Sequence, residues 1–429
     1  MPQRLSLPPG HAGAPCLVAF SGGADSTALL LLAAESGLPD LRAVHVHHGL
    51  QDAADAWAAH CEAACAQWGV PITVCRVQVA ADDPAGPEAA ARKARYAAFR
   101  ELLPAGGLLL TGHHRGDQAE TVLLRLLRGS GVEGLAAIRA LSAFGTGWLW
   151  RPLLDQPGDA LRALVESRGL SWIEDPHNQA PRYARSWLRT ALLPRLRERW
   201  PEAEAQLAAT ASRCAETAEL LHELAAELLP ALRREDGGLS IAGLLALSVA
   251  RRRLVLRHWL AELDLPPPYD ETLRHLGREV LTVRADAEPL LRWPGGEFRR
   301  YRDGLYAAPP LAPLPADYAV DWDGDSDLVL PAGCGLLRAA APLRARVRLP
   351  RGGERLRLRG AAHHRSLRAL AQQQGLPPWI RERLAIIEVD GELLSIAGRW
   401  NADPTRTAGV LQSWSTDAPP GLPLSWRQI

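Results

Sequence analysis

The chain has 429 residues, a length that predicts about two or three domains. Hydrophobic residues make up 47% and charged residues 23% of it, which is typical of a globular protein with an ample core. The formal net charge of +1 excludes a chain-wide electrostatic attraction to nucleic acid, so any such contact must come from local clusters.

The cysteines and the N-terminal residues narrow the class of protein further. None of the six cysteines forms a C-x-x-C pair, so a zinc ribbon, an iron–sulfur site and a disulfide framework are all unsupported. The first residues, MPQRLSLPPGHAG, contain no apolar signal core, and no apolar run reaches membrane-spanning length. We therefore expect a cytoplasmic protein with no membrane partner. Lys93 is the only lysine, and arginine is the better residue for bidentate phosphate contacts, although a GC-rich genome also favours arginine.

The first predicted element is an apolar strand over 17–20, followed by the loop SGGADS at 21–26 and by a helix-periodic apolar segment. The two glycines permit positive φ and let backbone N–H groups approach an anion. The N-terminus of the following helix adds unpaired donors and a partial positive charge. Serine hydroxyls and the Asp25 carboxylate, which suits Mg²⁺, complete a predicted phosphate site.

The residues after the glycines decide which kind of phosphate loop this is. No lysine follows them, so the segment is not the G-x-x-x-x-G-K-[ST] loop that binds a terminal phosphate. The six residues instead resemble the signature of the N-type ATP pyrophosphatases, which bind the leaving pyrophosphate and make an adenylated intermediate. An ordinary strand–turn–helix is the alternative, because Gly and Ser favour turns in any context.

Strands and helices then alternate at short spacing. Predicted strands cover 41–46, 72–79 and 108–111, and predicted helices cover 52–68 and 88–103. This alternation indicates βαβ units and a parallel sheet, in which ligands bind beyond the carboxyl ends of the strands. The SGGADS loop, His47-His48 and Gly112-His113-His114 all follow predicted strand ends, so we expect them to converge.

A second candidate cluster lies on the helix predicted from Asp117. The carboxylates of Asp117 and Glu120 stand about one turn apart and can jointly hold a cationic amine. A capping box, with Asp117 as N-cap and Glu120 at N3, is the alternative for either residue alone. That alternative does not account for Arg125, Arg128 and the glycine-rich break at 129–131 that follow.

Arginines recur at helical spacing in several other places. Arg92 and Arg95 share one predicted helix face, and Arg182, Arg185 and Arg189 share another. Two further basic clusters cover 251–259 and 299–302. Basic residues interleaved with aromatic ones suit backbone contact with RNA and stacking on its bases. A solvated surface is the alternative for each cluster taken alone.

A Pro-rich stretch at 307–318, without periodicity, indicates a linker before the last part of the chain. Short β-like runs follow, with a helix around 366–374 and a hairpin near 386–396 that turns at Asp390-Gly391. The predicted fold class is α/β, with a parallel-sheet, Rossmann-like nucleotide-binding domain, a mainly helical domain and a small α+β C-terminal domain. The predicted bounds are 1–215, 216–310 and 331–429, with a linker at 311–330.

A set of motifs runs through the chain in a fixed order. They are SGGADS at 21–26, VHVHHGL at 44–50, ARKARY at 91–96, TGHHRGDQAET at 111–121, RPLL at 151–154, EDPHN at 174–178, RGGERLRLRG at 351–360 and GLPPWIRERL at 375–384. Together they resemble the tRNA(Ile)-lysidine synthetase family over nearly the whole chain. Ser186 departs from the family pattern, which has Asn after Arg185, and Arg115-Gly116 replaces a more acidic or alanine-containing pair.

The resemblance implies a reaction in two steps. ATP first activates the wobble cytidine of an isoleucine tRNA with a CAU anticodon at its ring carbonyl oxygen, giving an O-adenylate and pyrophosphate. The ε-amine of free L-lysine then attacks the activated ring carbon and expels AMP, which leaves lysidine. The unpaired anticodon base can enter the site without duplex opening.

The resemblance also implies roles for residues at the matching positions. The catalytic residues are expected to be Asp25, Asp117, Glu120 and Arg92, with Asp25 as the Mg²⁺ ligand. The ATP site is expected to include Ser21, Gly22, Gly23, Ala24, Asp25, Ser26, His47, Gly112 and His113. Contacts with tRNA are expected from Arg95, Arg125, Arg128, Arg182, Arg185 and Arg189, and Arg92 or Arg95 would face the lysine carboxylate or a phosphate. Because the lysine amine has a reference pKa of about 10.4 and must lose a proton, Glu120 is the predicted base.

Three alternatives stay open. A tRNA-base thiolase of the same superfamily generally needs paired cysteines, whereas this chain offers only C-x-x-x-C at 61–65. A small-molecule ATP pyrophosphatase or amidotransferase would not need Arg-rich helices and an extra C-terminal module. The joint presence of SGGADS, Asp117 and Glu120 disfavours an RNA-binding scaffold without activity.

Overall fold

A computed structural model describes most of the chain. The described residues are 4–49, 53–79, 86–174, 184–284, 287–407, 409–414 and 418–422. The chain divides into two compact units, residues 1–220 and 221–429. Each unit has hydrophobic cores of its own.

The first unit is built on a six-stranded sheet with the strand order β3-β2-β1-β4-β6-β5. Its strands are β1 (Cys16–Ala19), β2 (Arg42–His47), β3 (Ile72–Arg76), β4 (Leu108–Leu110), β5 (Leu141–Phe144) and β6 (Gly147–Trp150). All neighbouring strands are parallel except β5 and β6, which form an antiparallel hairpin. The predicted parallel sheet is confirmed, and the edge hairpin is an addition that the sequence pattern does not predict.

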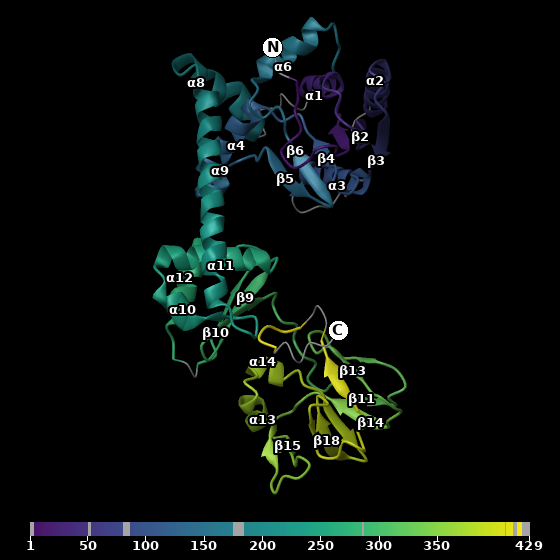
Figure 1. The fold of residues 1–429 in the computed structure, drawn as a ribbon, viewed down its shortest axis with the longest axis vertical. Coiled ribbons are helices and arrows are strands. Elements are labelled where there is room, and N and C mark those ends of the chain that lie inside the picture. Colours follow the sequence, from purple (N-terminus) through teal and green to yellow (C-terminus); the bar gives the residue numbers. More distant parts are fainter. Residues whose placement is uncertain are drawn as a thin grey trace. The chain divides into compact units, whose positions relative to one another are not determined.

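Helices cover both faces of this sheet (Figure 1). They are α1 (Ala24–Glu35), α2 (Ala54–Gln67), α3 (Pro87–Leu102), α4 (Arg115–Leu127), α5 (Val132–Leu135) and α6 (Gly158–Ser167). On β1, Cys16 and Val18 pack with α1, α2 and α6, whereas Leu17 packs with α3. Successive strand residues point to opposite faces, and both faces are buried. The strands therefore read as continuous apolar runs in the sequence.

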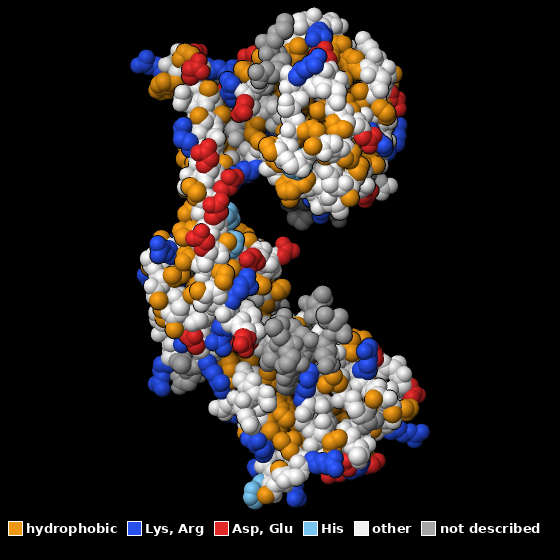
Figure 2. Space-filling view, viewed as in Figure 1, with side chains coloured by type: hydrophobic (Ala, Val, Ile, Leu, Met, Phe, Trp, Pro, Cys, Tyr) orange, Lys and Arg blue, Asp and Glu red, His pale blue; other side chains and the backbone are white. Residues whose placement is uncertain are grey.

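The first unit ends in helices. These are α7 (Ala184–Trp187), the π-helical turn η2 (Leu188–Leu192), α8 (Leu193–Arg199) and the start of α9 (Ala203–Leu228). The helical run from α8 to α9 is interrupted at Trp200-Pro201. Proline disfavours the α conformation of the residue before it, and Trp200 has φ −131° and ψ 87°. Figure 2 shows acidic side chains, in red, along α9.

The second unit continues with short helices and a small sheet. After the 3₁₀ turn η3 (Pro230–Leu232), the helices are α10 (Ile241–Ala246), α11 (Val249–Glu262), α12 (Asp270–His275) and the π-helical segment η4 (Leu276–Leu281). The antiparallel sheet has the order β7-β10-β9-β8 and consists of β7 (Leu239–Ser240), β8 (Leu290–Trp293), β9 (Gly296–Tyr301) and β10 (Gly304–Ala308). A region predicted as mainly helical thus also contains four strands.

Buried charged residues on β9, above all Arg300, explain why the sequence pattern does not predict this sheet. Arg300 lies on β9 and is buried, as is Glu297 on the same strand. Its Nη1 donates to the carbonyl oxygens of Val280, Leu281 and Val283 at 2.9, 3.0 and 2.8 Å, and so satisfies the carbonyls at the end of η4. The basic cluster at 299–302 is therefore partly internal rather than wholly available to RNA.

The last part of the chain is rich in strands. One sheet has the order β11-β14-β17-β18-β19, from β11 (Ala319–Trp322), β14 (Ala345–Arg348), β17 (Ile386–Val389), β18 (Glu392–Ile396) and β19 (Trp400–Asn401). The others combine β12 (Leu328–Val329), β13 (Leu336–Arg338) and β20 (Leu411–Ser413), and β15 (Arg355–Leu356) with β16 (Arg365–Ser366). The helices are α13 (Leu367–Gln373) and α14 (Pro378–Arg381).

Local predictions for this part are mostly confirmed. β17 and β18 form the expected hairpin, and Asp390 and Gly391 have φ of 54° and 78°, as a tight hairpin turn requires. The helix predicted around 366–374 is α13, which Ser366 caps by accepting from the Ala369 N–H. The predicted linker at 311–330 needs correction, because β11 and β12 lie within it and pair with β14 and β13. Strands this short leave little alternation to detect.

Candidate active site

The candidate site lies at the switch point of the parallel sheet. The strand order reverses between β1 and β4, and in such sheets ligands bind outside the carboxyl ends of the two strands at that point. The loop 21–26 follows β1, and the turn 112–114 follows β4. Two of the three loops expected to converge therefore start at the binding edge.

The loop 21–26 has a shape that requires glycine. Gly22 has φ of 82°, and a Cβ added there would clash with Ile173 Cδ1 and lie 3.0 Å from Cys61 Sγ. Gly23 is the N-cap of α1 and makes no side-chain cap bond, so the helix presents backbone N–H groups. Ser21 Oγ lies 3.0 Å from Ser26 Oγ, which itself lies 3.0 Å from the Gly23 carbonyl oxygen. These contacts brace a loop of the kind that holds phosphate oxygens.

Gly112 brings the second loop against the first. A Cβ at Gly112 would lie 3.0 Å from the carbonyl carbon and oxygen of Asp25 and 3.2 Å from the Ser26 nitrogen. Only glycine allows this approach of two backbones without displacement. The predicted convergence of the loops after β1 and β4 is therefore present in the structure.

Helix α4 begins earlier than the sequence predicts. Its N-cap is His114, whose Nδ1 accepts from the Gly116 N–H at 3.0 Å, while Asp117 Oδ2 accepts from the His114 N–H at 2.9 Å. The alternative of a capping box with Asp117 as N-cap and Glu120 at N3 is wrong, because a histidine nitrogen serves as the acceptor and Asp117 takes the N3 role. Glu120 consequently lies inside the helix, with 1% of its surface exposed.

Replacing His114 with alanine should destabilise the first unit by about 1 kcal/mol, the usual cost of losing an N-cap acceptor. The Gly116 N–H loses its partner, and Asp117 keeps only its own half of the box. Denaturant unfolding followed by circular dichroism measures the change. His114→Asn, whose side-chain oxygen can accept the same bond, should retain most of the stability. Equal losses in both variants would contradict the capping role.

The acidic pair on α4 already holds a cation. Arg189 Nε lies 2.7 Å from Glu120 Oε1, and its Nη2 lies 3.2 Å from Glu120 Oε2 and 3.1 Å from Asp117 Oδ1. The carboxylates therefore face one point, as predicted, and a guanidinium from η2 occupies it. Burial raises the pKa of Glu120, while the hydrogen bonds and charge of Arg189 oppose that rise.

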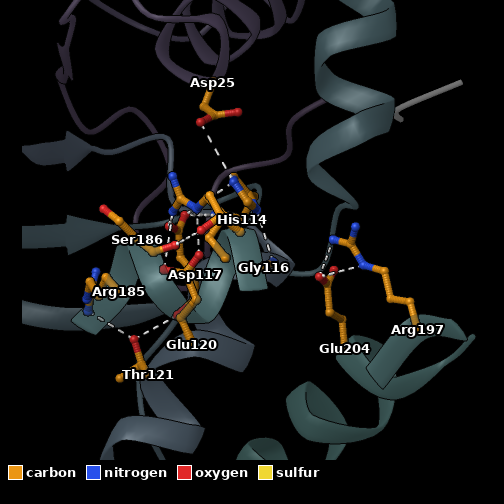
Figure 3. A network of polar contacts seen from close by, with 12 residues as sticks. Asp25, His114, Gly116, Asp117, Glu120, Thr121, Arg185, Ser186, Arg197 and Glu204 are labelled. Carbon is orange, nitrogen blue, oxygen red and sulfur yellow. Dashed lines mark hydrogen bonds and ion pairs between the residues drawn. The ribbon is translucent and has the colours of Figure 1, made fainter. Parts of the chain in front are cut away.

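His114 links this pair to the phosphate loop. Its Nε2 lies 3.7 Å from Asp25 Oδ2 and 3.6 Å from Asp117 Oδ2. Figure 3 shows Asp25, His114, Asp117 and Glu120 within one network of polar contacts. Burial raises the pKa of Asp25, an effect that the charge of His114 opposes. The Asp25 side chain is 46% exposed, so its carboxylate is accessible from solvent.

The predicted His113 is part of a different, cationic environment. Its Nδ1 lies 2.8 Å from Thr111 Oγ1. Burial lowers its pKa to about 4, and the charges of Arg151, Arg92 and Arg185 add to that lowering, while Asp117 opposes it. His113 is therefore a neutral imidazole at neutral pH, beside three positive charges.

The two arginines predicted on α3 separate into different contacts. Arg92 donates to the Tyr96 hydroxyl at 3.2 Å and stacks on its ring at 4.7 Å. Arg95 Nε donates to His48 Nε2 at 3.2 Å, at the end of β2. Burial and the Arg95 charge lower the pKa of His48 to about 4. Arg92 therefore adds to the positive charge around His113, whereas Arg95 is hydrogen-bonded to the loop after β2.

The contacts that the structure shows for His47 are not with the phosphate loop. His47 Nε2 lies 3.1 Å from Asp55 Oδ1 and 3.3 Å from Arg76 Nη1, which ties β2 to α2 and β3. His45, its neighbour on the same face of β2, lies nearer to the phosphate loop. Its Nδ1 is 3.0 Å from the carbonyl oxygen of Phe20, the residue before that loop. The period of two along a strand allowed either histidine to be chosen from the sequence.

The arginines predicted to contact tRNA also differ in their surroundings. Arg185 Nη2 donates to Thr121 Oγ1 at 3.1 Å, and Arg125 Nη1 donates to the Gly134 carbonyl at 2.7 Å. Arg128 is the exposed C-cap of α4. Arg182 lies outside the described residues. Ser186 follows Arg185 in the sequence and stands where the family pattern has Asn. Its side chain is buried.

Sequence reasoning missed three residues that shape the site. They are His114, Arg151 and Ile173. His114 was visible as part of a strand-end pair, and Arg151 begins the RPLL motif. Ile173 gives no signal of its own, because its contact with Gly22 joins segments far apart in the chain.

The fold and the loop define a class of protein, which comparison with known families supports. Residues 7–196 match the PP-loop domain family, so the first unit is that of an ATP-using PP-loop enzyme. Residues 239–306 match the TilS substrate binding domain, and residues 345–416 match the TilS substrate C-terminal domain. The chain belongs to the tRNA(Ile)-lysidine synthase family, whose members are ligases that form a C–N bond.

Relatives match the chain along almost its full length. The tRNA(Ile)-lysidine synthase of Xanthomonas campestris pv. campestris is 45% identical over 403 residues, covering 92% of each chain. That of Serratia proteamaculans is 44% identical over 426 residues, covering 96% of this chain and 95% of its own. A solved structure, the U34-tRNA thiolase of Methanococcus maripaludis with its [4Fe-4S] cluster, matches with 19% identity and a TM-score of 0.40, covering 48% of this chain and 73% of the other.

Two further observations bear on the classes considered above. Cys61 and Cys65 are both buried in the core on α2, and burial raises their pKa values to about 12 and about 11. Thiols that stay protonated are poor nucleophiles, which disfavours sulfur transfer through this pair. In the part of the chain that the structure describes, no helix is long and apolar enough to cross a membrane.

Proposed function

We propose that this chain joins free L-lysine to the wobble cytidine of a tRNA(Ile) with a CAU anticodon, at the expense of ATP, and so forms lysidine. Cytidine is first adenylated at its ring carbonyl oxygen, with release of pyrophosphate, and the lysine amine then replaces AMP. The carrying observation is that the turn before α4 packs against Asp25 through Gly112, which places the acidic pair beside the phosphate loop.

The first step depends on residues 21–26. The ring carbonyl oxygen forms a bond to the α-phosphorus of ATP, and the bond to pyrophosphate breaks. Backbone N–H groups at the start of α1 and the hydroxyls of Ser21 and Ser26 would hold the departing phosphates. Asp25 fits a Mg²⁺ ligand, because its carboxylate is half exposed beside this loop and Mg²⁺ commonly uses one or two carboxylates together with substrate phosphates. Bound Mg²⁺ would neutralise charge on those phosphates.

The second step depends on the acidic pair. Asp117 and Glu120 would hold the lysine amine, and Glu120 would accept its proton as the nitrogen attacks the ring carbon and the bond to AMP breaks. Arg189 now sits at that point, so the amine has to replace at least one of its hydrogen bonds. Arg92, close to His113 and Arg151, would face the lysine carboxylate or a phosphate.

The tRNA would approach from the side of α4 and α7. Arg185 and Arg128 lie there, as do the exposed side chains of Leu127 and Trp187. Arginine suits phosphate contacts, and an exposed indole suits stacking on an unpaired base. Exposed basic and aromatic groups next to the acidic pair support an anticodon loop as the substrate segment.

Replacing Arg189 with methionine should shift the acidic limb of lysine transfer to higher pH. Burial raises the pKa of Glu120, and Arg189 opposes that rise, so its removal raises this pKa further. A base must be ionised to accept a proton, and a higher pKa delays ionisation. The rate of lysine transfer from preformed adenylated tRNA, measured across pH, gives the shift. Arg185→Met, which loses a bond to Thr121 instead, should shift the limb less. A shift to lower pH would contradict the assignment of Glu120.

Incubation with ATP, labelled lysine and total tRNA tests the proposal directly. Label in one isoleucine isoacceptor, together with pyrophosphate release that requires tRNA, is the expected result. Label in free nucleotide, or incorporation of sulfur from a sulfur donor in place of lysine, would point to one of the other classes. No transfer of lysine to any isoacceptor would overturn the proposed function.

A further inference from the structure

A small cavity lies within the second unit and is lined by arginines. Its volume is about 190 Å³. Arg302 reaches it from the turn between β9 and β10, Arg368 from α13 and Arg381 from α14. Arginines from three separate elements therefore line one small hollow, next to Tyr301.

Arg302 is held toward this cavity by its backbone and by its contacts. It has φ of 53°, in the left-handed region that side chains other than glycine rarely adopt. Its Nη2 donates to the Gln372 carbonyl at 3.1 Å, and its guanidinium lies 5.1 Å from the centre of the Tyr301 ring. Arg302 lies in the two-residue turn that joins β9 to β10, and a positive φ there is what a tight hairpin turn requires.

The cavity has an excess of positive charge. Among the residues that the structure describes, Glu288 is the one acidic residue that lines the cavity, and Arg302, Arg368 and Arg381 form no ion pair with a carboxylate. Some other arginines of this unit do form ion pairs, such as Arg348 with Glu354 and Glu388. Figure 2 shows arginine side chains, in blue, in the region of α13 and β15. The charge is thus local, in a chain with a formal net charge of only +1.

We propose that this cavity binds a phosphate of the tRNA backbone. This inference rests on the proposed function, since it takes tRNA as the substrate. Arginine binds phosphate oxygens in pairs of parallel hydrogen bonds, and three arginines already line this one cavity. The volume is below the roughly 300 Å³ at which pockets for larger ligands begin, and so suits a phosphate group rather than a whole nucleotide.

The shape of the site distinguishes a phosphate from an acidic protein segment. Carboxylates along a peptide are spread over several side chains, whereas here the positive groups face one compact volume. The apolar lining from Leu376 and Pro378 offers a surface for a ribose next to the phosphate. RNA backbone contact of this kind fixes the position of the nucleic acid without reading its sequence.

A double-mutant cycle with Arg368→Gln and Arg381→Gln tests this inference. Neither side chain has an ion pair among the described residues, so both variants should fold, which thermal unfolding checks. Filter binding of the tRNA(Ile) substrate at several salt concentrations gives the affinities. Each variant should bind about tenfold more weakly, the usual loss for a hydrogen bond to a charged group. The double variant should lose less affinity than the product of the two single-variant losses, because both arginines hold one phosphate. The slope of log affinity against log salt should become shallower by about one.

Arg274→Gln is the matched control. Arg274 is an exposed arginine on α12 in the same unit, outside the cavity, and its removal changes the net charge equally. A double variant whose loss of tRNA affinity equals the product of the two single losses would overturn a shared phosphate site. A loss of the same size in Arg274→Gln would overturn it as well. Weaker binding of poly-glutamate by the variants with unchanged tRNA affinity would assign the cavity to an acidic protein instead. Should the wild type transfer lysine while the variants bind tRNA normally, this inference fails and the proposed function stands; a wild type that transfers no lysine defeats the function itself.

Discussion

Replacing Glu120 with glutamine should leave adenylate formation intact and slow lysine transfer by roughly 10²- to 10⁴-fold, the usual contribution of a positioned general base. Glutamine keeps the size of Glu120 and can still accept a hydrogen bond from Arg189, but it cannot take a proton from the lysine amine. That amine has a reference pKa of about 10.4 and is protonated at neutral pH. Pyrophosphate release and incorporation of labelled lysine, followed in one reaction, report the two steps separately.

Glu101→Gln provides the same chemical change at a harmless position. Glu101 is exposed on α3, so this variant should affect neither step. If Glu120→Gln stops pyrophosphate release as well, Glu120 acts in activation or in holding Arg189, and another group must be the base. Lysine transfer at the wild-type rate would also reject Glu120 as the base.

The parallel sheet could be predicted because its strands are buried on both faces. β1 and β4 appear in the sequence as apolar runs, CLVA and LLL, and Ser21 and Gly112 stand two residues after them at the binding edge. The edge hairpin β5–β6 could not, because each strand has only four residues and LSAF shows no alternation. In the second unit, the buried charges of Glu297 and Arg300 hide the period of β9.

The candidate site was predictable in its parts but not in their pairing. Helical spacing predicts that Asp117 and Glu120 share one face of α4, and the sequence of residues 21–26 predicts a phosphate site. The partner of the acidic pair could not be found, because Arg189 is 69 residues beyond Glu120 and only the packing of η2 against α4 brings them together. The N-cap was placed three residues late because histidine is not among the residues that usually cap helices.

Replacing Gly22 with alanine should lower ATP-dependent pyrophosphate release by at least about 100-fold. The left-handed backbone at φ 82° costs a residue with a Cβ about 1 kcal/mol. The new Cβ would also clash with Ile173 Cδ1, so the loop or the segment at 173 has to move. A displacement of about 1 Å in a group that positions the reacting phosphates costs on the order of 100-fold in rate. Single-turnover pyrophosphate release with saturating tRNA measures the loss.

Two matched variants separate backbone strain from the clash. Gly37→Ala, at the other end of α1, also has positive φ, at 64°, but its Cβ would meet no atom within 4 Å, so it isolates the cost of the left-handed backbone. Ile173→Ala in the Gly22→Ala background removes the clashing methyl group and should restore part of the activity, but not all, because the strain at φ 82° remains. Pyrophosphate release at the wild-type rate in Gly22→Ala would mean that ATP does not depend on the shape of this loop. The site would then have to be sought away from residues 21–26, since the glycine-favoured backbone of this loop is what is expected to let its N–H groups approach phosphate.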